Sequence, residues 1–411
     1  DVEVCDCDGN NFDECGVCNG DSICTEDLSL AFNTGWSWFS FNVHPEDPTL
    51  STLLAPISDQ AEFINSQASG SATNYGDYGW DGSLEGLSPT EMYMINMHDP
   101  SNLTITGLPV DVDSTFINLG TGWNWVGYLP QNSGDLATAL SSLGESAEFV
   151  NTQTFGSATN YGDYGWYGSL TTMEPGQGYL IKMNQPGVLV YPEFDNLSRL
   201  SKNKGEVVLS PTISNWTYNY SDYQYIGTIS ASIDNRDDIE GDVLSVFVDD
   251  ECRGIAERMY FPFNDSYFYI LQVYSNMVEG EELTFKYYDS LNDEIVEYTE
   301  QLTFTNNMIV GDGFNTFSLS RITPSEFLLS QAYPNPFNPT TTLSFAIPID
   351  SKVLLSVYNL QGREVSSLID SNMDAGYHSI VWDANAYASG VYFVKMVAGE
   401  FVNTQKLMLI K

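Results

Sequence analysis

The sequence predicts an all-β chain, a string of small β-sandwich-like domains. Its 33 Gly, 17 Pro and 13% aromatic residues suit many short strands and tight turns. Apolar and polar residues alternate over short runs, which is the period of a half-buried strand. No stretch shows helical periodicity long enough to frame a helical domain. The best short helix covers residues 135–143, with Asp135 as its N-cap, so we expect about one short helix per repeat unit.

The last ninety residues show the strand pattern most clearly. Alternating apolar residues mark strands at 343–347 and 353–357, and the continuous run 391–394 indicates a more deeply buried strand. The Asn-Pro pairs at 335–336 and 338–339 fix extended or turn backbone, which a helix interior does not accommodate. We therefore expect a β-sandwich at residues 322–411.

Sequence motifs in this tail resemble the C-terminal sorting domain of bacterial type IX secretion substrates, a small immunoglobulin-like sandwich related to the FlgD-type repeat. The resemblance implies that the type IX export machinery carries the chain across the outer membrane to the cell surface or beyond. It implies nothing about what the chain does there. The motif residues that carry it are Pro334, Asn335, Pro336, Phe337, Asn338, Pro339, Gly362, Gly390 and Lys411.

The chain is strongly acidic, with 14 Lys and Arg against 55 Asp and Glu and a formal net charge of −41. Nucleic acid and anionic membrane surfaces are poor partners, because both need clustered cations. Carboxylates at this density can bind hard cations such as calcium. We expect no membrane span and no organic cofactor, and the start at Asp1 resembles a processed terminus.

An internal duplication defines two repeats, A at residues 26–112 and B at residues 113–196. Segment 61–84 matches segment 147–170 at 19 of 24 positions, and within it the decapeptide 71–80 returns unchanged as 157–166. The opening strand keeps only 4 of 10 residues between the copies. Divergence is therefore uneven, so recent duplication alone does not explain the identical decapeptide.

Two interpretations of the decapeptide remain open. Its aromatic side chains could be presented on a loop, with an aspartate as polar handle, and stack on a sugar ring or a neighbouring protein. Alternatively, the aromatic rings pack inward while the glycines occupy positive-φ positions. The candidate binding or assembly residues are Tyr75, Asp77, Tyr78, Trp80, Tyr161, Asp163, Tyr164 and Trp166.

Paired tryptophans open each repeat, and their i, i+2 spacing puts each pair on one face of a strand. We expect these pairs, Trp36/Trp38 and Trp123/Trp125, to be core rather than a binding platform. The repeats resemble the Trp-Asn-Trp modules that often precede a sorting tail. Repeat B keeps the family's ending at 175–182, and repeat A departs from it. This resemblance implies an architecture and no chemistry.

The N-terminal segment, residues 1–25, is rich in cysteine and acidic residues and resembles short calcium-binding repeats of secreted proteins. Cysteine pairs could hold zinc, but an exported chain favours disulfides. Candidate calcium ligands are Asp6, Asp8, Asn10 and Asp13. The disulfide candidates are Cys5, Cys7, Cys15, Cys18, Cys24 and Cys252.

A polar stretch, residues 197–205, is predicted to be a linker, and residues 206–321 form another strand-rich domain. This domain resembles a sandwich module found upstream of type IX tails. Its Cys252 could bridge to the N-terminal segment, bond a second chain or stay a buried thiol. Four tyrosines between 218 and 225 lie at strand spacing, and we expect half of them in the core.

Catalysis finds little support, because the three histidines are scattered and no nucleophile elbow, metalloprotease motif or phosphate loop is present. We therefore expect that the chain is not an enzyme. Two hypotheses remain. The first is a secreted structural protein that contacts copies of itself or other surface proteins and assembles into a filament or coat. The second is a carbohydrate-binding adhesin that uses the Tyr/Trp loops.

Overall fold

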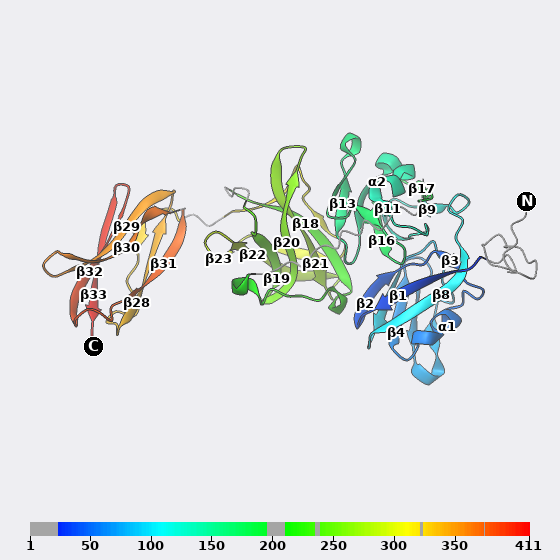
Figure 1. Ribbon diagram of the computed structural model, residues 1–411, viewed down its shortest axis with the longest axis horizontal. Helices are drawn as coiled ribbons and strands as arrows, with labels where there is room; N and C mark the ends of the chain where they lie inside the picture. The colour runs from blue at the N-terminus through cyan, green and yellow to red at the C-terminus, as the bar shows by residue number, and fades with distance from the viewer. Residues whose placement is uncertain (1–23, 195–209, 235–238, 321–323, 374) are drawn as a thin grey trace, which may run out of the picture. The chain divides into compact units, whose positions relative to one another are not determined.

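The computed structural model describes residues 24–194, 210–234, 239–320, 324–373 and 375–411. Two compact units make up the chain, Asp1–Leu319 and Ser320–Lys411. β-strands dominate both units, which confirms the predicted fold class (Figure 1). Within the described residues, no helix has the length and apolarity needed to cross a membrane.

Repeat A consists of two antiparallel sheets around one apolar core. The smaller sheet has the order β1-β8-β3 and the larger sheet has the order β2-β7-β4-β5-β6. One short helix, α1 (Leu50–Leu53), covers the core beside Ile57 and Ile95, which are fully buried. The strands are β1 (Glu26–Phe32), β2 (Gly35–Phe39), β3 (Val43–His44), β4 (Ala61–Ser66), β5 (Ser71–Asn74), β6 (Trp80–Gly82), β7 (Tyr93–Met97) and β8 (Ser101–Pro109).

Repeat B reproduces the larger sheet with the order β10-β16-β12-β13-β14, and two strand pairs, β11-β15 and β17-β9, complete it. The predicted helix is shorter than expected, because α2 (Leu136–Ala139) gives way to a 3-10 segment at Ser141–Ser146. Its predicted N-cap is confirmed, since Thr138 N donates to Asp135 Oδ1 at 3.0 Å. The strands are β9 (Ile117–Leu119), β10 (Gly122–Gly127), β11 (Gly134–Asp135), β12 (Ala147–Asn151), β13 (Ser157–Asn160), β14 (Trp166–Gly168), β15 (Thr172–Met173), β16 (Gly178–Met183) and β17 (Gly187–Leu189).

The third domain, residues 210–319, is one strongly bent nine-stranded sheet of order β23-β22-β19-β20-β21-β18-β25, in which β24 also pairs with β22 and β26 also pairs with β18. The bend lies in the long strand β20, whose first half pairs β19 and whose second half pairs β21. Phe285 and Tyr287 fill the core inside the bend. The strands are β18 (Tyr225–Ile233), β19 (Val243–Val248), β20 (Glu251–Phe261), β21 (Ser266–Ser275), β22 (Glu279–Asp289), β23 (Glu294–Glu297), β24 (Leu302–Thr305), β25 (Ile309–Val310) and β26 (Phe317–Leu319).

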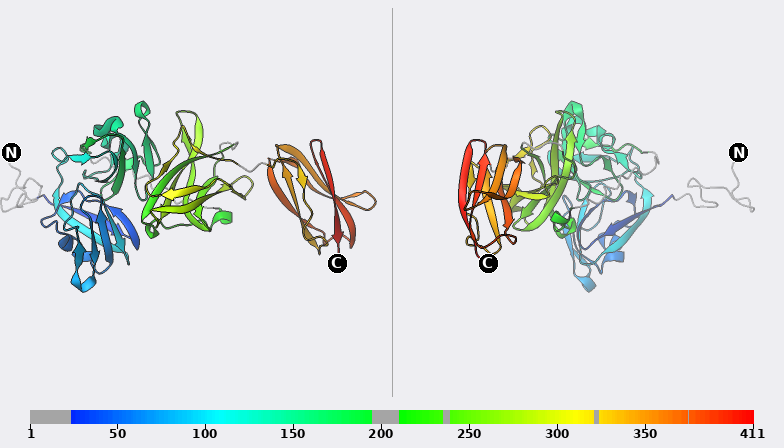
Figure 2. Two further views of the ribbon diagram at one scale, coloured as in Figure 1. Left: turned by 180° about the vertical axis from the view of Figure 1, so that it is seen from behind. Right: turned by 60° about the vertical axis from the view of Figure 1, so that its left-hand side comes forward.

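The second unit is a seven-stranded antiparallel sandwich, with a three-stranded sheet (β27-β28-β31) and a four-stranded sheet (β30-β29-β32-β33). The predicted strands at 343–347 and 353–357 fall within β28 and β29, and their inward residues are fully buried between the sheets. Figure 2 shows this unit from two further sides. The strands are β27 (Leu328–Leu329), β28 (Thr340–Ile347), β29 (Ser351–Asn359), β30 (Glu364–Met373), β31 (Gly376–Asp383), β32 (Gly390–Ala398) and β33 (Phe401–Leu409).

The sorting motif packs against this sandwich. Phe337 is buried against Trp382 with ring centroids 5.4 Å apart, and Phe337 N donates to the Met408 carbonyl at 3.0 Å. Asn335 Nδ2 donates to the Lys406 carbonyl, and Met408 N donates to Asn335 Oδ1. The motif therefore pins the last strand of the chain.

Cys252 is a free, buried thiol, which is one of the three alternatives that the sequence left open, and it forms no bridge to the N-terminal segment. It lies 3.3 Å from Ser245 Oγ, and burial raises its pKa. The calcium candidates Asp6, Asp8, Asn10 and Asp13 lie outside the described residues, as do the cysteines Cys5, Cys7, Cys15 and Cys18. Disulfides and calcium in segment 1–25 therefore stay predictions. The linker 197–205 also lies outside the described residues.

We predict that Leu355→Ala destabilises the second unit by about 2–5 kcal/mol, because Leu355 is fully buried between its sheets. Denaturant unfolding of the full chain should show an earlier transition for this unit and an unchanged transition for the first. The control is Lys352→Ala, which removes an exposed ion pair with Asp370 and should shift the free energy of unfolding by less than about 1 kcal/mol. Equal effects of the two variants would contradict the assigned core.

Candidate interaction surface of the tandem repeats

The two repeats pack against each other around a local two-fold axis. Phe39 pairs with Gln177 and Val126 pairs with Glu91 through isolated β-bridges, and these two contacts are equivalent under exchange of the repeats. Two backbone hydrogen bonds repeat the pattern at 3.1 Å, Ser40 N to Gly176 O and Gly127 N to Thr90 O. Because each contact occurs twice, the repeat pair has two equivalent faces.

A reciprocal glutamine contact closes each side of this interface. Gln153 accepts from Trp38 N and donates to Trp36 O, both at 2.9 Å. Gln67 accepts from Trp125 N at 2.8 Å and donates to Trp123 O at 2.7 Å. Each side-chain amide therefore pairs with one N–H and one carbonyl on the edge strand of the other repeat. Gln153 is 6% exposed and Gln67 is exposed.

The tryptophans lie outside the repeat cores. Trp38 is 6% exposed, and with the half-buried Trp36, Trp123 and Trp125 it belongs to an apolar cluster shared by both repeats and the third domain. Ile226, Tyr223 and Tyr274 are the buried members that the third domain supplies to this cluster. The expectation of burial therefore holds for Trp38, but the packing joins domains rather than filling a single core.

The third domain binds the edge of repeat B by hydrogen bonds. Gln272 Nε2 donates to Asn151 Oδ1 and to the Thr152 carbonyl, both at 2.8 Å. Tyr274 Oη donates to the Gln153 carbonyl at 2.7 Å. Burial raises the pKa of Tyr274 well above its ordinary value, which keeps this hydroxyl a donor.

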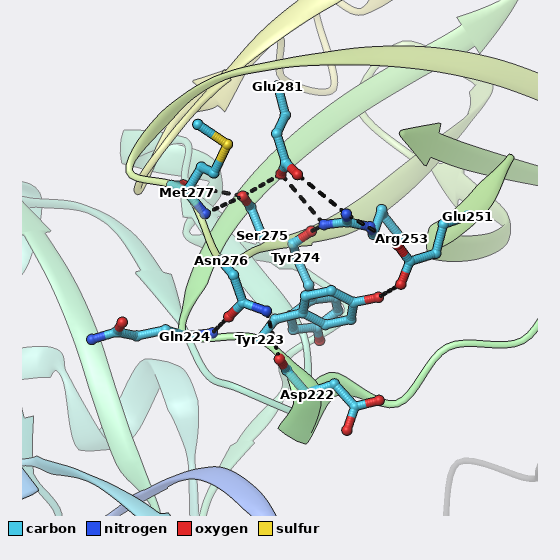
Figure 3. Close-up of polar contacts among 10 residues, drawn as sticks. All are labelled: Asp222, Tyr223, Gln224, Glu251, Arg253, Tyr274, Ser275, Asn276, Met277 and Glu281. Atoms are coloured by element: carbon cyan, nitrogen blue, oxygen red, sulfur yellow. Dashed lines mark hydrogen bonds and ion pairs between the residues drawn. The ribbon is translucent and has the colours of Figure 1, made fainter. Parts of the chain in front are cut away.

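A buried arginine supports this contact from within the third domain (Figure 3). Arg253 donates from both Nη atoms to Glu281, at 3.2 and 3.3 Å, and from Nη1 to the Tyr274 carbonyl at 3.2 Å. Its guanidinium lies 4.7 Å from the ring centroid of Tyr223, whose hydroxyl donates to Glu251 at 2.5 Å. The charge is paired and stacked, so it fixes the two tyrosines at the interface.

The identical decapeptides fold into identical loops, loop A (residues 75–79) and loop B (residues 161–165). The glycines have positive φ in both, 64° and 76° at Gly76 and Gly79, and 63° and 74° at Gly162 and Gly165. In loop A, Asn74 accepts from the Gly76 N–H and donates to the Ala61 carbonyl. Asn160 does the same in loop B. Backbone geometry thus explains the identical Gly and Asn residues.

Loop B packs on an aromatic cluster of the third domain formed by Phe261, Phe263 and Phe314. The Tyr161 ring lies 5.2–5.9 Å from all three, and the Tyr164 ring lies 4.7 Å from Phe263. Gly313 N donates to Tyr161 Oη at 2.7 Å. Burial raises the pKa of Tyr161. Trp166 is half-buried against the core of repeat B, and Asp163 is exposed.

Loop A is exposed. Tyr75 is 58% exposed and Tyr78 is 93% exposed, while Trp80 packs against the core of repeat A. Asp77 is also exposed. Of the eight candidate residues, Tyr161 and Tyr164 of loop B contact the third domain, although Tyr164 is still 61% exposed. Tyr75 and Tyr78 of loop A are open to solvent.

An open groove of about 380 Å³ lies beside the Gln67 contact, at the junction of the two repeats. Its wall combines an aromatic ring, carboxylate and amide groups. Glu91 Oε2 is buried there and has no hydrogen-bond partner among the described residues. The lining includes Gln67, Thr90, Glu91, Phe116, Asn124 and Trp125.

Sequence reasoning found the loops and missed their docking site and the glutamines. A sequence signal for the glutamines existed, because Gln67 and Gln153 occupy the same position in the duplicated block. The Phe cluster had none, since it unites residues about fifty positions apart. Across residues 24–194, 210–234, 239–320, 324–373 and 375–411, no group of three or more His, Cys, Asp or Glu is arranged to hold a metal ion.

Comparison with known proteins identifies the tail. Residues 331–411 match the family described as the secretion system C-terminal sorting domain. This type IX signal marks a secreted protein bound for the cell surface or the extracellular space. Among curated proteins, none matches the sequence significantly.

Among solved structures, 37 chains are similar to this chain. The Bacillus anthracis TIE protein is similar at 12% identity and a TM-score of 0.13, and the match covers 86% of this chain and 60% of that one. The chain thus spans less than two thirds of that protein.

We predict that Gln153→Ala destabilises the first unit by about 1–3 kcal/mol, because it leaves the buried Trp38 N–H without an acceptor. Gln67→Ala removes the equivalent contact where water can replace it, so it should cost less than about 1 kcal/mol. Tryptophan fluorescence during guanidinium unfolding measures both. A larger loss for Gln67→Ala would contradict the burial difference between the two sites.

We also predict that the first unit loses stability above pH 10. Burial raises the pKa of Tyr218 to about 12, whereas the unfolded tyrosine ionises near 10. The unfolded state therefore releases this proton first, so the stabilisation is complete below pH 10 and is lost as pH rises toward 12. Tyr218→Phe should make the fall in unfolding free energy between pH 10 and 12 shallower. An unchanged slope would refute the shift.

Proposed function

We propose that this protein is a secreted structural component of the bacterial surface whose tandem repeats contact neighbouring chains. The supporting observation is loop A. It repeats a loop that already serves as a protein contact within the chain, in the same conformation, and its tyrosines are open to solvent. The neighbours are copies of itself in a filament or coat, or other surface proteins. The proposal assigns no reaction to the chain.

The exposed aromatic area of loop A and its rigid backbone favour this function. Tyr75 and Tyr78 present aromatic area on a backbone held by hydrogen bonds, so docking costs little conformational entropy. Tyrosine is enriched among the residues that dominate protein interfaces. Calcium bound by segment 1–25 would add a second, chelator-sensitive contact.

Cross-linking on intact cells tests the proposal. Formaldehyde treatment of cells that export the chain should give a cross-linked species of higher mass, and Tyr75→Ala/Tyr78→Ala should remove most of it. The control, Leu108→Ala, truncates another exposed apolar residue of repeat A and should leave the species unchanged. Absence of the species, or its persistence in the loop A variant, would contradict the proposal. Electron microscopy with and without a calcium chelator then distinguishes filaments or coats from discrete complexes.

A carbohydrate-binding adhesin is the second candidate, and the groove beside Trp125 favours it. An aromatic face next to the Glu91 carboxylate and side-chain amides has the chemistry that binds sugar rings. Under this function, oligosaccharide titration should quench tryptophan fluorescence with saturation, and Trp125→Ala should abolish the signal. A glycan panel without saturable binding would remove this candidate.

A further inference from the structure

The local two-fold axis gives the repeat pair two equivalent seats for a β-domain, and the third domain occupies one of them. The occupied seat consists of loop B, the Asn151 edge and the Gly35 turn. A Cβ atom at Gly35 would lie 2.1 Å from the Ser221 carbonyl oxygen, which shows how closely the third domain approaches. The equivalent seat consists of loop A, the Asn65 edge and the Gly122 turn.

The second seat is vacant among the described residues. A Cβ atom at Gly122 would meet nothing within 4 Å. Asn65 Oδ1 is buried and has no hydrogen-bond partner among the described residues, whereas the equivalent Asn151 Oδ1 accepts from Gln272 of the third domain. An unpartnered acceptor, an open turn and two exposed tyrosines thus coincide at the positions whose equivalents contact the third domain on the other side.

The seats differ in charge. Glu91 replaces Gln177, and Asp81 replaces Tyr167, so the vacant seat carries two carboxylates that the occupied seat lacks. Lys182 is the single Lys or Arg in residues 26–196, and it pairs with Glu148 at 2.5 Å. No cation of the repeats is therefore free to neutralise Asp81 or Glu91.

A second copy of the chain fits poorly. Its third domain is already seated on its own repeats, and the hairpin that meets Tyr167 carries Asp265, which accepts from Tyr260 Oη. In the vacant seat, this hairpin would bring Asp265 toward Asp81. Like charges across a contact select against a partner.

We propose that the vacant seat binds a β-domain of another surface protein, one that presents an aromatic-tipped hairpin with a free backbone N–H, a side-chain amide donor and basic residues. The aromatic cluster of the partner packs on loop A in the same way as Phe261, Phe263 and Phe314 pack on loop B. The amide donor satisfies Asn65, and the basic residues face Asp81 and Glu91. This inference rests on the proposed function and names the class of neighbour.

A donor version of the full chain supplies the aromatic cluster and a cation as a defined probe, while its Gln272 and Tyr274 stay bonded to its own repeat B. Tyr161→Ala/Tyr164→Ala uncovers its Phe cluster, and Tyr75→Ala/Tyr78→Ala removes its own loop A. Tyr260→Lys adds a cation next to Tyr167, the position of Asp81 in the vacant seat. Circular dichroism checks its fold, and a milder donor keeps Tyr161, whose hydrogen bond to Gly313 holds the loop.

Sedimentation of labelled donor with unlabelled wild-type acceptor measures binding. We expect a complex that weakens at least about tenfold on Tyr75→Ala/Tyr78→Ala in the acceptor and is unchanged by Leu108→Ala. Donors that carry Tyr260→Lys should bind about two- to fivefold tighter than donors that keep Tyr260 at low salt, and high salt should remove the difference.

Three results would overturn the inference. The first is that neither donor forms a complex with the wild-type acceptor. The second is that a donor binds the wild-type and the Tyr75→Ala/Tyr78→Ala acceptors equally. The third is self-association of the wild-type chain that depends on loop A, which would make a second copy the occupant. The cross-linking experiment on cells reports separately on the proposed function. A loop A-dependent cross-link combined with any of these results retains the function and rejects this partner.

Discussion

The reciprocal contact between the repeats is the constraint on which the rest of the first unit depends. Each repeat ends its larger sheet with a tryptophan strand, and the side-chain amide of the other repeat satisfies that strand's free backbone groups. An edge strand left open is an aggregation risk, so mutual closure protects both repeats at once. The contact also fixes the local two-fold axis. Because of this axis, the repeat pair has two equivalent faces on which another domain can dock.

The third domain breaks this symmetry. Its Gln272 and Tyr274 donate hydrogen bonds to acceptors on the edge of repeat B, and its aromatic cluster packs against loop B. The buried pair of Arg253 and Glu281 lies within the third domain and holds the Tyr274 carbonyl in place beside repeat B. One domain cannot fill two seats, so the same loop contacts the third domain in one repeat and lies free of it in the other.

Local features of the chain were predictable because they depend on neighbouring residues. Asp135 caps its helix, the glycines of the decapeptides have positive φ, and the tail alternates in strand register. The role of Trp38 was not predictable, because burial by Gln153 and Tyr274 joins residues more than a hundred positions apart. Periodicity shows that a face is apolar, but only topology decides whether a core or another domain covers it.

The residues of the two identical loops fall into two groups, those that the turn needs and those that can contact another protein. Gly76, Gly79 and Asn74 are needed for the turn in either repeat, so folding alone explains their repetition. Tyr78 is 93% exposed, so its side chain is not needed for folding. It nevertheless matches Tyr164, whose ring packs on Phe263.

An exposed aromatic contact on a surface of net charge −41 is short-ranged, whereas the repulsion between two such chains reaches about 8 Å at physiological salt. Aromatic docking therefore succeeds only where a partner's cations or salt offset the carboxylates beside the loop. Charge then selects the partner, and the tyrosines supply the binding energy.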